Sequence, residues 1–157
     1  MIFSKSLTTG VVPEDWKIAN VTPIFKKGSK QVSGNYRPVS LTSHVGKLLE
    51  SILKDGMIAH LRKYRLINDS QHGFTAKRSC LTNILDYLEY VTLQIDLGNP
   101  VDAIYFDFQK AFDKVPHRRL LYKIKALGIS GNILQWIENW LTNRRQRVVV
   151  HNPTGRM

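Results

Sequence analysis

Cysteine, acidic residues and long apolar runs are all scarce in this sequence of 157 residues, and each shortage excludes something. Cys80 is the only cysteine, so no disulfide can form within the chain and a zinc site built from cysteines is excluded. No apolar run approaches the roughly 20 residues of a membrane helix, and the opening "MIFSKSLTTGVV" has no apolar core long enough for a signal peptide. We therefore expect a soluble intracellular protein, in the nucleus or the cytoplasm, with no membrane partner.

The charge is strongly one-sided, because 23 Lys and Arg stand against 12 Asp and Glu, which leaves a formal net charge of +11. The basic residues gather in "HLRKYR" (60–65), "HRRL" (117–120) and "RRQR" (144–147). This pattern favours a polyanionic partner, most simply nucleic acid. A charged surface that only keeps the chain soluble is the alternative, and each cluster taken alone is more typical of a solvated helix end.

Apolar periodicity predicts a single domain that mixes strands and helices. The β-branched stretches 16–25 and 36–43 flank the Gly- and Ser-rich segment 26–35, so they predict a hairpin with a long, basic, mobile loop. Helical spacing predicts a helix of about five turns after this hairpin, and a second helix that packs its apolar stripe on a sheet. The expected later elements are a helix from Val45 to Tyr64 with Ser43 as its N-cap, a helix from Leu81 to Gly98, helices 120–127 (capped by Gly128) and 133–141, and a strand 146–151.

Residues 101–108, "VDAIYFDF", predict a strand that is buried on both faces and ends near Asp107. A charge there is costly unless a partner compensates it. Asp107 either caps the next turn or pairs with a basic neighbour, or it holds a divalent cation, as strand-end aspartates do in phosphoryl transfer. A two-metal site needs further carboxylates. Only Asp113 and Glu138 are acidic downstream, and no acidic pair follows a strand.

The segment "YFDFQKAFDKVPHRRLLYKIKALGI" resembles the first catalytic segment of reverse transcriptases (RNA-directed DNA polymerases) from non-LTR, LINE-type, jockey-like retrotransposons. The upstream segments "VPEDWKIANVTPIFKKG", "GNYRPVSLTSHVGKLLESIL" and "INDSQHGFTAKRSCLTNIL" are similar to the fingers segments of that family, in the same order. The resemblance runs from about Val12 to about Val150. Several ordered motifs make it specific, whereas a lone "FDF" would be weak.

The resemblance implies a catalytic role for Asp107, as the first metal-binding aspartate of a nucleotidyltransferase. The backbone carbonyl of Phe108 matches a second ligand of the same Mg²⁺ ions. Phe112 matches the bulky residue that lies under the incoming sugar and rejects a 2′-hydroxyl, although a core aromatic residue is the alternative. The implied partners are an RNA template, a DNA primer and dNTPs.

The resemblance also implies that the basic hairpin binds the nucleotide. Lys26 or Lys27, together with Arg37, match positions that grip the triphosphate, where fixed cations stabilise the charge of the transition state. Simple solvation at the surface is the competing explanation for the two lysines.

Other residues that match the family's motifs are expected to be structural. Gly73 is expected to permit a turn, and His117 to begin a helix rather than to bind metal. The full set is Gln71, Gly73, Phe74, Arg78, Ser79, Asp113 and His117.

The sequence departs from the family after its first catalytic segment. It contains neither the Gly- and Gln-containing segment nor the paired-aspartate hairpin, and no thumb or endonuclease domain. The expected fold is therefore α+β: a partial right-hand polymerase with fingers-like residues 1–100 and an incomplete antiparallel palm sheet in 101–157. Such a fragment would expose a strand edge and apolar surface, which favours marginal stability or association. We expect the isolated chain to be inactive, because the remainder of the polymerase is missing.

Two other functional hypotheses stay open at this point. The chain can act as a basic nucleic-acid-binding module without catalysis, or it can be an unselected relic. The open reading frame through every fingers motif argues mildly against long decay. Salt-dependent RNA or DNA binding that survives Asp107→Ala would favour the binding module.

Overall fold

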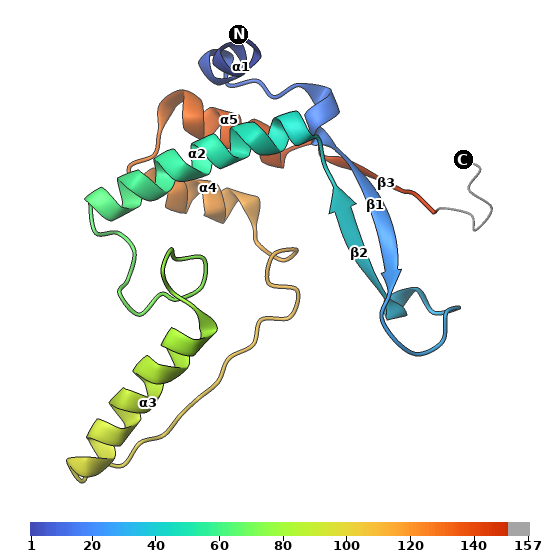
Figure 1. Ribbon diagram of the computed structural model, residues 1–157. Helices are drawn as coiled ribbons and strands as arrows, with labels where there is room; N and C mark the ends of the chain where they lie inside the picture. The colour runs from blue at the N-terminus through green and yellow to red at the C-terminus, as the bar shows by residue number, and fades with distance from the viewer. Residues whose placement is uncertain (151–157) are drawn as a thin grey trace. The chain divides into compact units, whose positions relative to one another are not determined.

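The computed structural model describes residues 1–150, and they fall into two compact units. One unit combines residues 1–58 with the chain from Pro116 onward, and the other is Ala59–Val115. Figure 1 labels the helices and strands. Along the chain they are α1 (Ile2–Thr9), β1 (Ile18–Phe25), β2 (Tyr36–Leu41), α2 (His44–Lys63), α3 (Cys80–Asp96), α4 (His117–Ala126), α5 (Gly131–Leu141) and β3 (Arg145–Val148), with short 3-10 helices at Glu14–Lys17 and Ser33–Asn35.

The first unit contains a three-stranded sheet in the order β2-β1-β3. The hairpin of β1 and β2 confirms the two predicted strands, and β3 runs parallel to β1. The predicted last strand is confirmed for Arg145–Val148, while His151 lies outside the described residues. Because β3 is parallel, the sheet is mixed, and the expected antiparallel palm sheet is wrong for the described residues.

Two prolines lie opposite each other in the hairpin, and the hydrogen-bond pattern explains why both are tolerated. Pro23 pairs with Pro38. The Lys26 N–H donates to the Asn35 carbonyl at 2.8 Å, and hydrogen-bonded pairs alternate with non-bonded pairs in an antiparallel ladder. Counting back from Lys26 puts the prolines at a non-bonded pair, where neither needs an N–H to donate. The sequence "TPIF" therefore continues as strand through its proline.

Tryptophan side chains form the core of the first unit. Val12, Trp16, Leu49 and Trp136 are buried together. The indole N–H of Trp136 donates to the Ser6 hydroxyl at 2.9 Å, so its one polar atom is satisfied inside the core. The sequence reasoning did not predict α1, which carries Ser6. This short helix is held by its contact with α5 rather than by its own periodicity.

The predicted helix boundaries are confirmed where the sequence supplied caps. The Gly46 N–H donates to the Ser43 hydroxyl at 3.3 Å, which makes Ser43 the N-cap of α2. Gly128 follows the last residues of α4, and the Ile129 N–H donates back to the Ile124 carbonyl at 3.2 Å. No helix of the described residues is long and apolar enough to cross a membrane.

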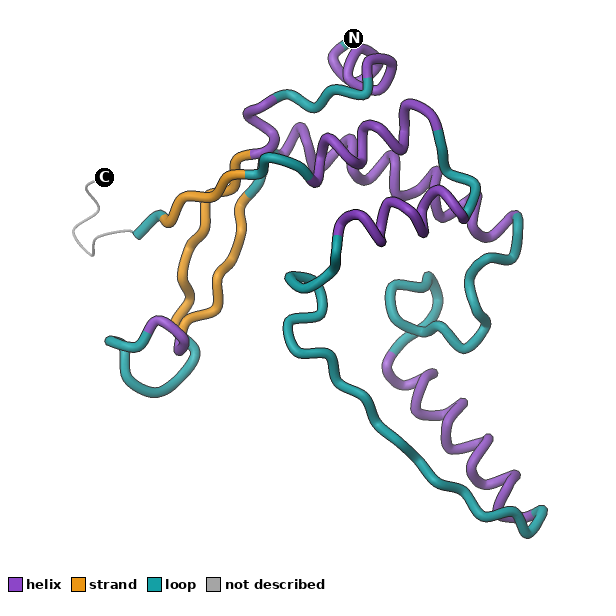
Figure 2. The backbone as a smooth tube through the Cα atoms, turned by 180° about the vertical axis from the view of Figure 1, so that it is seen from behind, coloured by secondary structure: helices purple, strands orange, loops and turns teal. Residues whose placement is uncertain are grey.

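The second unit contains the whole of α3 but no buried hydrophobic residue among those that the structure describes. The prediction that α3 packs its apolar stripe on a sheet is wrong, because Leu81, Ile84, Leu85 and Leu88 are all at least half exposed. Figure 2 draws the whole stretch between α3 and α4 as loop. The second unit offers no described strand for α3 to cover.

Candidate functional site

The predicted site residues are distributed over both units. The basic residues of the hairpin and His117 belong to the first unit. Asp107, Phe108, Phe112, Asp113, and the motif from Gln71 to Ser79 belong to the second unit.

The loop of the β1–β2 hairpin is held by its own polar side chains. The Asn35 amide donates to the Ser29 carbonyl at 2.9 Å, and the Tyr36 hydroxyl donates to the Lys30 carbonyl at 2.8 Å. Gly28 has a φ of 86°, and an added Cβ there would lie 2.7 Å from the Asn35 amide nitrogen. A glycine is therefore required for this turn, and the basic loop has a defined shape.

The hairpin register brings two of the predicted cations to one face. Arg37 pairs with Ile24, and Lys26 follows two residues later, so alternation directs both side chains to the same side of the ribbon. Lys27, at the start of the loop, is one residue further on, so the same alternation directs its side chain to the opposite side of the ribbon. All three are exposed, and none forms an ion pair with any described residue. The same-face arrangement favours Lys26 over Lys27 as the partner of Arg37.

Asp107 lies on an exposed, extended segment rather than on a strand. Residues 101–108 pair with no strand in the described part of the chain, and Phe106 is 82% exposed. The predicted doubly buried strand is therefore wrong. A strand needs a neighbour to accept its backbone hydrogen bonds, and the described residues of this unit supply none.

One polar contact connects this segment to α3. The hydroxyl groups of Tyr105 and Tyr87 form a hydrogen bond, with 3.1 Å between their oxygens. That hydrogen bond is the main cause that raises the pKa of the Tyr87 phenol above its ordinary value. The contact holds the segment that precedes Asp107 but provides no second carboxylate.

A tight turn connects Asp107 to α4. The Lys114 N–H donates to the Lys110 carbonyl at 3.1 Å, and the Lys114 ammonium donates to the Gln109 side-chain oxygen at 3.0 Å. Asp113 lies within this turn, and His117 is the first residue of α4. A further backbone bond joins the Val115 N–H to the Phe112 carbonyl at 3.5 Å, so neither Asp113 nor His117 supplies an observed bond that holds the turn.

Phe112 meets Phe74 in an edge-to-face contact. Their ring centroids are 6.0 Å apart and the ring planes are inclined by 89°. Both rings are largely exposed, at 79% for Phe112 and 92% for Phe74. Phe112 is thus not a buried core aromatic among the described residues, and both rings present faces to solvent.

Gly73 was expected to permit a turn, and the turn that forms there places its unusual backbone conformation on the next residue. Gly73 lies in a turn, but the left-handed backbone falls on the next residue, Phe74, with a φ of 58°. The Gln71 amide donates to the Gly73 carbonyl at 2.9 Å. Ser79 caps α3 in a reciprocal capping box with Thr82.

A polar cluster that sequence reasoning missed fixes this motif against α3. The buried His72 contacts the Thr82 hydroxyl and the Asp86 carboxylate, each at 3.0 Å. Arg78 donates to the same Asp86 oxygen at 3.0 Å and to the Asp69 carbonyl at 3.2 Å. The sequence carried one signal of this cluster, because Thr82 and Asp86 are four residues apart and therefore share one face of α3.

The described residues do not form a complete metal site. No group of three or more His, Cys, Asp or Glu side chains in residues 1–150 is arranged to hold a metal ion. Asp107 and the Phe108 carbonyl would supply only two ligand groups, whereas Mg²⁺ requires near-octahedral oxygen coordination. The donor set of the described residues is therefore too small for the predicted cofactor.

Comparison with known proteins gives matches along most of the chain. Residues 24–156 match the family model described as reverse transcriptase (RNA-dependent DNA polymerase). The chain is 29% identical over 153 residues to a probable RNA-directed DNA polymerase from transposon BS of Drosophila melanogaster, covering 97% of this chain and 17% of the relative. It is 27% identical over 146 residues to the RNA-directed DNA polymerase from mobile element jockey of Drosophila funebris, covering 92% of this chain and 16% of that protein.

A relative from another element gives a similar match. The retrovirus-related Pol polyprotein from type-1 retrotransposable element R2 of Popillia japonica is 26% identical over 137 residues, or 87% of this chain and 19% of that protein. The chain thus spans less than a fifth of the length of these relatives. The resemblance inferred from the ordered motifs is confirmed.

Proposed function

Because the chain belongs to the reverse transcriptase family, we propose that it forms the fingers and the first part of the palm of an RNA-directed DNA polymerase. In this proposal, residues 1–100 are fingers-like and residues 101–157 begin the palm of a right-hand fold. The observation that carries it is the family match over residues 24–156, which includes both the basic hairpin and Asp107. The partners are an RNA template, a DNA primer and dNTPs, and the location is the nucleus or the cytoplasm.

The hairpin is proposed to bind the triphosphate of the incoming nucleotide. Lys26 and Arg37 share a face and have no ion-pair partner among residues 1–150, so both charges are available to a polyanion. Cations fixed over a polyphosphate stabilise the charge that develops during phosphoryl transfer. Lys27 is the alternative to Lys26 and is the first residue to test against it.

Asp107 is proposed to supply one carboxylate of the catalytic centre, with the Phe108 carbonyl beside it. Divalent metal ions are general cofactors of reverse transcriptases, but the ligands found in residues 1–150 are too few to hold them. The other carboxylates would come from the remainder of the polymerase. We therefore propose that the isolated chain does not polymerise. Phe112 is proposed to contact the sugar, which is consistent with its exposed ring.

A second candidate is a basic nucleic-acid-binding module without catalysis. The observation that favours it is the net charge of +11 together with unpaired cations on the hairpin. Both proposals predict salt-dependent RNA binding by the isolated chain. They differ in whether Asp107 matters once the rest of a polymerase is present.

Primer extension tests the polymerase proposal. The purified chain, an RNA template, a DNA primer, dNTPs and Mg²⁺ are expected to give no extension, whereas a relative's polymerase in which these 157 residues replace the matching region is expected to extend the primer. Asp107→Ala is expected to abolish that activity, and Asp113→Ala, in the same exposed segment, is the matched control. Extension by the isolated chain that is lost in Asp107→Ala would overturn the proposed inactivity. An active chimera that tolerates Asp107→Ala would overturn the catalytic role.

A further inference from the structure

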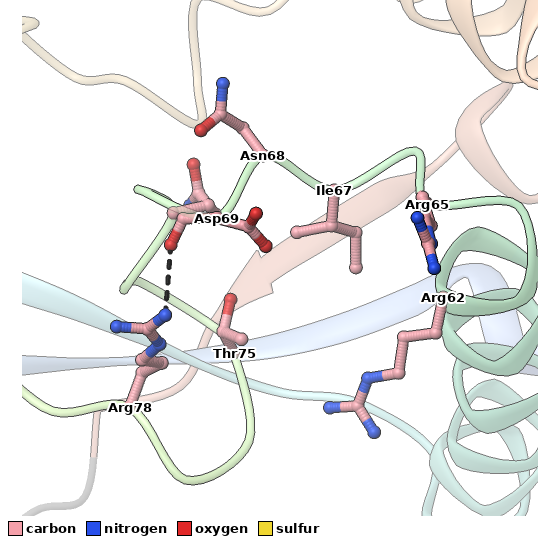
Figure 3. Close-up of a pocket in the computed structure, with 8 residues that line it drawn as sticks. Arg62, Arg65, Ile67, Asn68, Asp69, Thr75 and Arg78 are labelled. Carbon is pink, nitrogen blue, oxygen red and sulfur yellow. Dashed lines mark hydrogen bonds between the residues drawn. The ribbon is translucent and has the colours of Figure 1, made fainter.

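A small pocket lies within the second unit, between the end of α2 and the start of α3. Its volume is about 180 Å³, and its lining includes Arg62, Arg65 and Arg78. Figure 3 shows Arg62 extending from the end of α2 toward the loop that carries Thr75 and Arg78. Basic side chains from two separate segments thus border one cavity.

The charge of the pocket is positive. Three guanidinium groups and the carboxylate of Asp69 line it, and Arg78 is also paired with the Asp86 carboxylate, so an excess of one positive charge remains. The guanidinium groups of Arg62 and Arg65 form no ion pair with any residue from 1 to 150. Stabilisation of the C-terminus of α2 is an alternative explanation for Arg62 and Arg65. It does not explain Arg78, which lies outside α2 and reaches the pocket from the loop.

Arg78 is held in place before any ligand arrives. It donates to the Asp86 carboxylate at 3.0 Å and to the Asp69 carbonyl at 3.2 Å, as the dashed line of Figure 3 marks for the second bond. His72 contacts the same Asp86 oxygen and therefore holds Asp86, the partner of Arg78, in position. Two of the five guanidinium donors are used, and a preorganised guanidinium binds an oxyanion with little loss of side-chain entropy.

The size of the pocket limits the ligand. Sites for drug-sized molecules usually have volumes of roughly 300–1,000 Å³, and this cavity of about 180 Å³ is smaller. It therefore fits a single anionic group, and guanidinium groups bind phosphate with matched geometry.

An exposed aromatic residue beside the pocket points to a nucleic-acid strand as the source of the phosphate. Phe74 directly precedes Thr75 and is 92% exposed. Its backbone is in the left-handed region, with a φ of 58°, which a phenylalanine rarely adopts. Proteins bind single strands by combining cations for the backbone with aromatic faces for the bases.

We propose that Arg62, Arg65 and Arg78 form a phosphate subsite for single-stranded RNA, with Phe74 as the adjacent stacking surface. The identity of the strand rests on the proposed polymerase function, in which the template is RNA. The subsite is separate from the hairpin residues and from Asp107 in its role, because it binds a backbone phosphate of the strand rather than the reacting nucleotide.

The test measures binding of the full chain to a fluorescent 12-nucleotide single-stranded RNA over a series of salt concentrations. The double variant Arg62→Gln/Arg65→Gln is expected to bind about tenfold more weakly and to lower the salt slope by about 1, as the loss of one phosphate contact does. Lys123→Gln/Lys125→Gln on α4 removes the same charge from exposed positions and is expected to keep the slope. Equal losses in the two double variants would overturn the proposal in favour of unspecific attraction.

Three further measurements identify the ligand. Phe74→Leu is expected to weaken RNA binding several-fold while circular dichroism stays unchanged, and unchanged binding would overturn the stacking role. Arg78→Lys keeps the charge but loses the guanidinium fork, and is also expected to weaken binding. Inorganic phosphate and dTTP are competitors. If inorganic phosphate or dTTP displaces the RNA when its phosphate concentration equals that of the RNA phosphates, a nucleic-acid strand is not the ligand and the proposal is overturned.

The outcome also separates this proposal from the polymerase function. If neutralising Lys26 and Arg37 abolishes extension by the chimera while the pocket variants bind RNA normally, the pocket proposal fails and the polymerase function stands. If the pocket variants lose RNA binding while the chimera never extends a primer, the pocket is supported and the polymerase function fails.

Discussion

The two units of this chain are ordered by different forces. The first unit buries Val12, Trp16, Leu49 and Trp136 in one apolar core. In the second unit the only buried side chain of the described residues is a histidine, His72, while phenylalanines and leucines face solvent. Apolar burial stabilises in proportion to area, whereas a network of exposed hydrogen bonds contributes little net free energy. The contrast shows that a regular helix such as α3 can form in a unit that has no hydrophobic core of its own.

The contrast also concerns function. The predicted catalytic aspartate and the phosphate pocket belong to the weakly packed unit, and the basic hairpin belongs to the well-packed one. Segments with few buried apolar contacts are those that open most easily. Four substitutions would break or sharpen this comparison.

The largest effect is expected for Trp136→Ala. Its side chain is 2% exposed, and its loss would create a cavity and leave the Ser6 hydroxyl without its indole donor. We expect a loss of about 3–5 kcal/mol in the free energy of unfolding, measured by urea denaturation. Tyr90→Ala on α3, where the ring is 60% exposed, is the aromatic control and should change stability by less than about 0.5 kcal/mol. Similar losses for both would remove the distinction between the units.

A smaller, local effect is expected for His72→Ala. The substitution removes contacts to Thr82 and Asp86 that hold the loop against α3. Amide hydrogen exchange in α3 should become about tenfold faster, corresponding to about 1–2 kcal/mol, while α5 keeps its protection. His44→Ala, at the exposed first residue of α2, is the control. Uniform acceleration in α3 and α5 would mean that the units do not open separately.

A pH-dependent effect is expected for Glu50→Gln in the first unit. Burial raises the pKa of the Glu50 carboxyl above 4.5, and Arg144 and Lys47 oppose the shift. Folding thus favours the protonated form, so the contribution of Glu50 is most favourable below pH 4.5 and is lost as the pH rises through the folded-state pKa.

Glu50→Gln should therefore stabilise the chain at pH 7, by less than about 1 kcal/mol because the carboxyl is only partly buried, and should have almost no effect at pH 4. Urea midpoints at the two pH values measure the difference. Glu89→Gln, on the exposed surface of α3, provides the reference. A stabilisation that is larger at pH 4 would contradict the assigned cause.

The smallest effect is expected for Asp107→Ala. The side chain is exposed and has no ion-pair partner among residues 1–150, so the free energy of unfolding should change by less than about 0.5 kcal/mol. Thermal denaturation measures it, with Asp113→Ala for comparison. A destabilisation above about 1 kcal/mol would mean that the segment is packed, as the sequence alone predicted.

Sequence reasoning succeeded where the controlling interactions are local. The Ser43 cap, the glycine after α4 and the helical periods of α2 to α5 depend on neighbouring residues, and they predicted the elements well. The prediction of a buried strand at 101–108 was wrong, because an apolar run indicates only that a segment is suited to burial. Whether a strand forms there depends on a partner for its backbone, which the described residues lack.

The pocket was beyond sequence reasoning for a related reason. Arg62 and Arg78 are 16 positions apart, and only the loop held by His72 and Asp86 brings them to one cavity. By itself, the sequence determined the family, the net charge, the caps and most of the elements, because these depend on residue types in order. The tertiary structure decided which apolar residues are buried, which cations share a face and which arginines share a pocket, because those follow from contacts between residues distant in the chain.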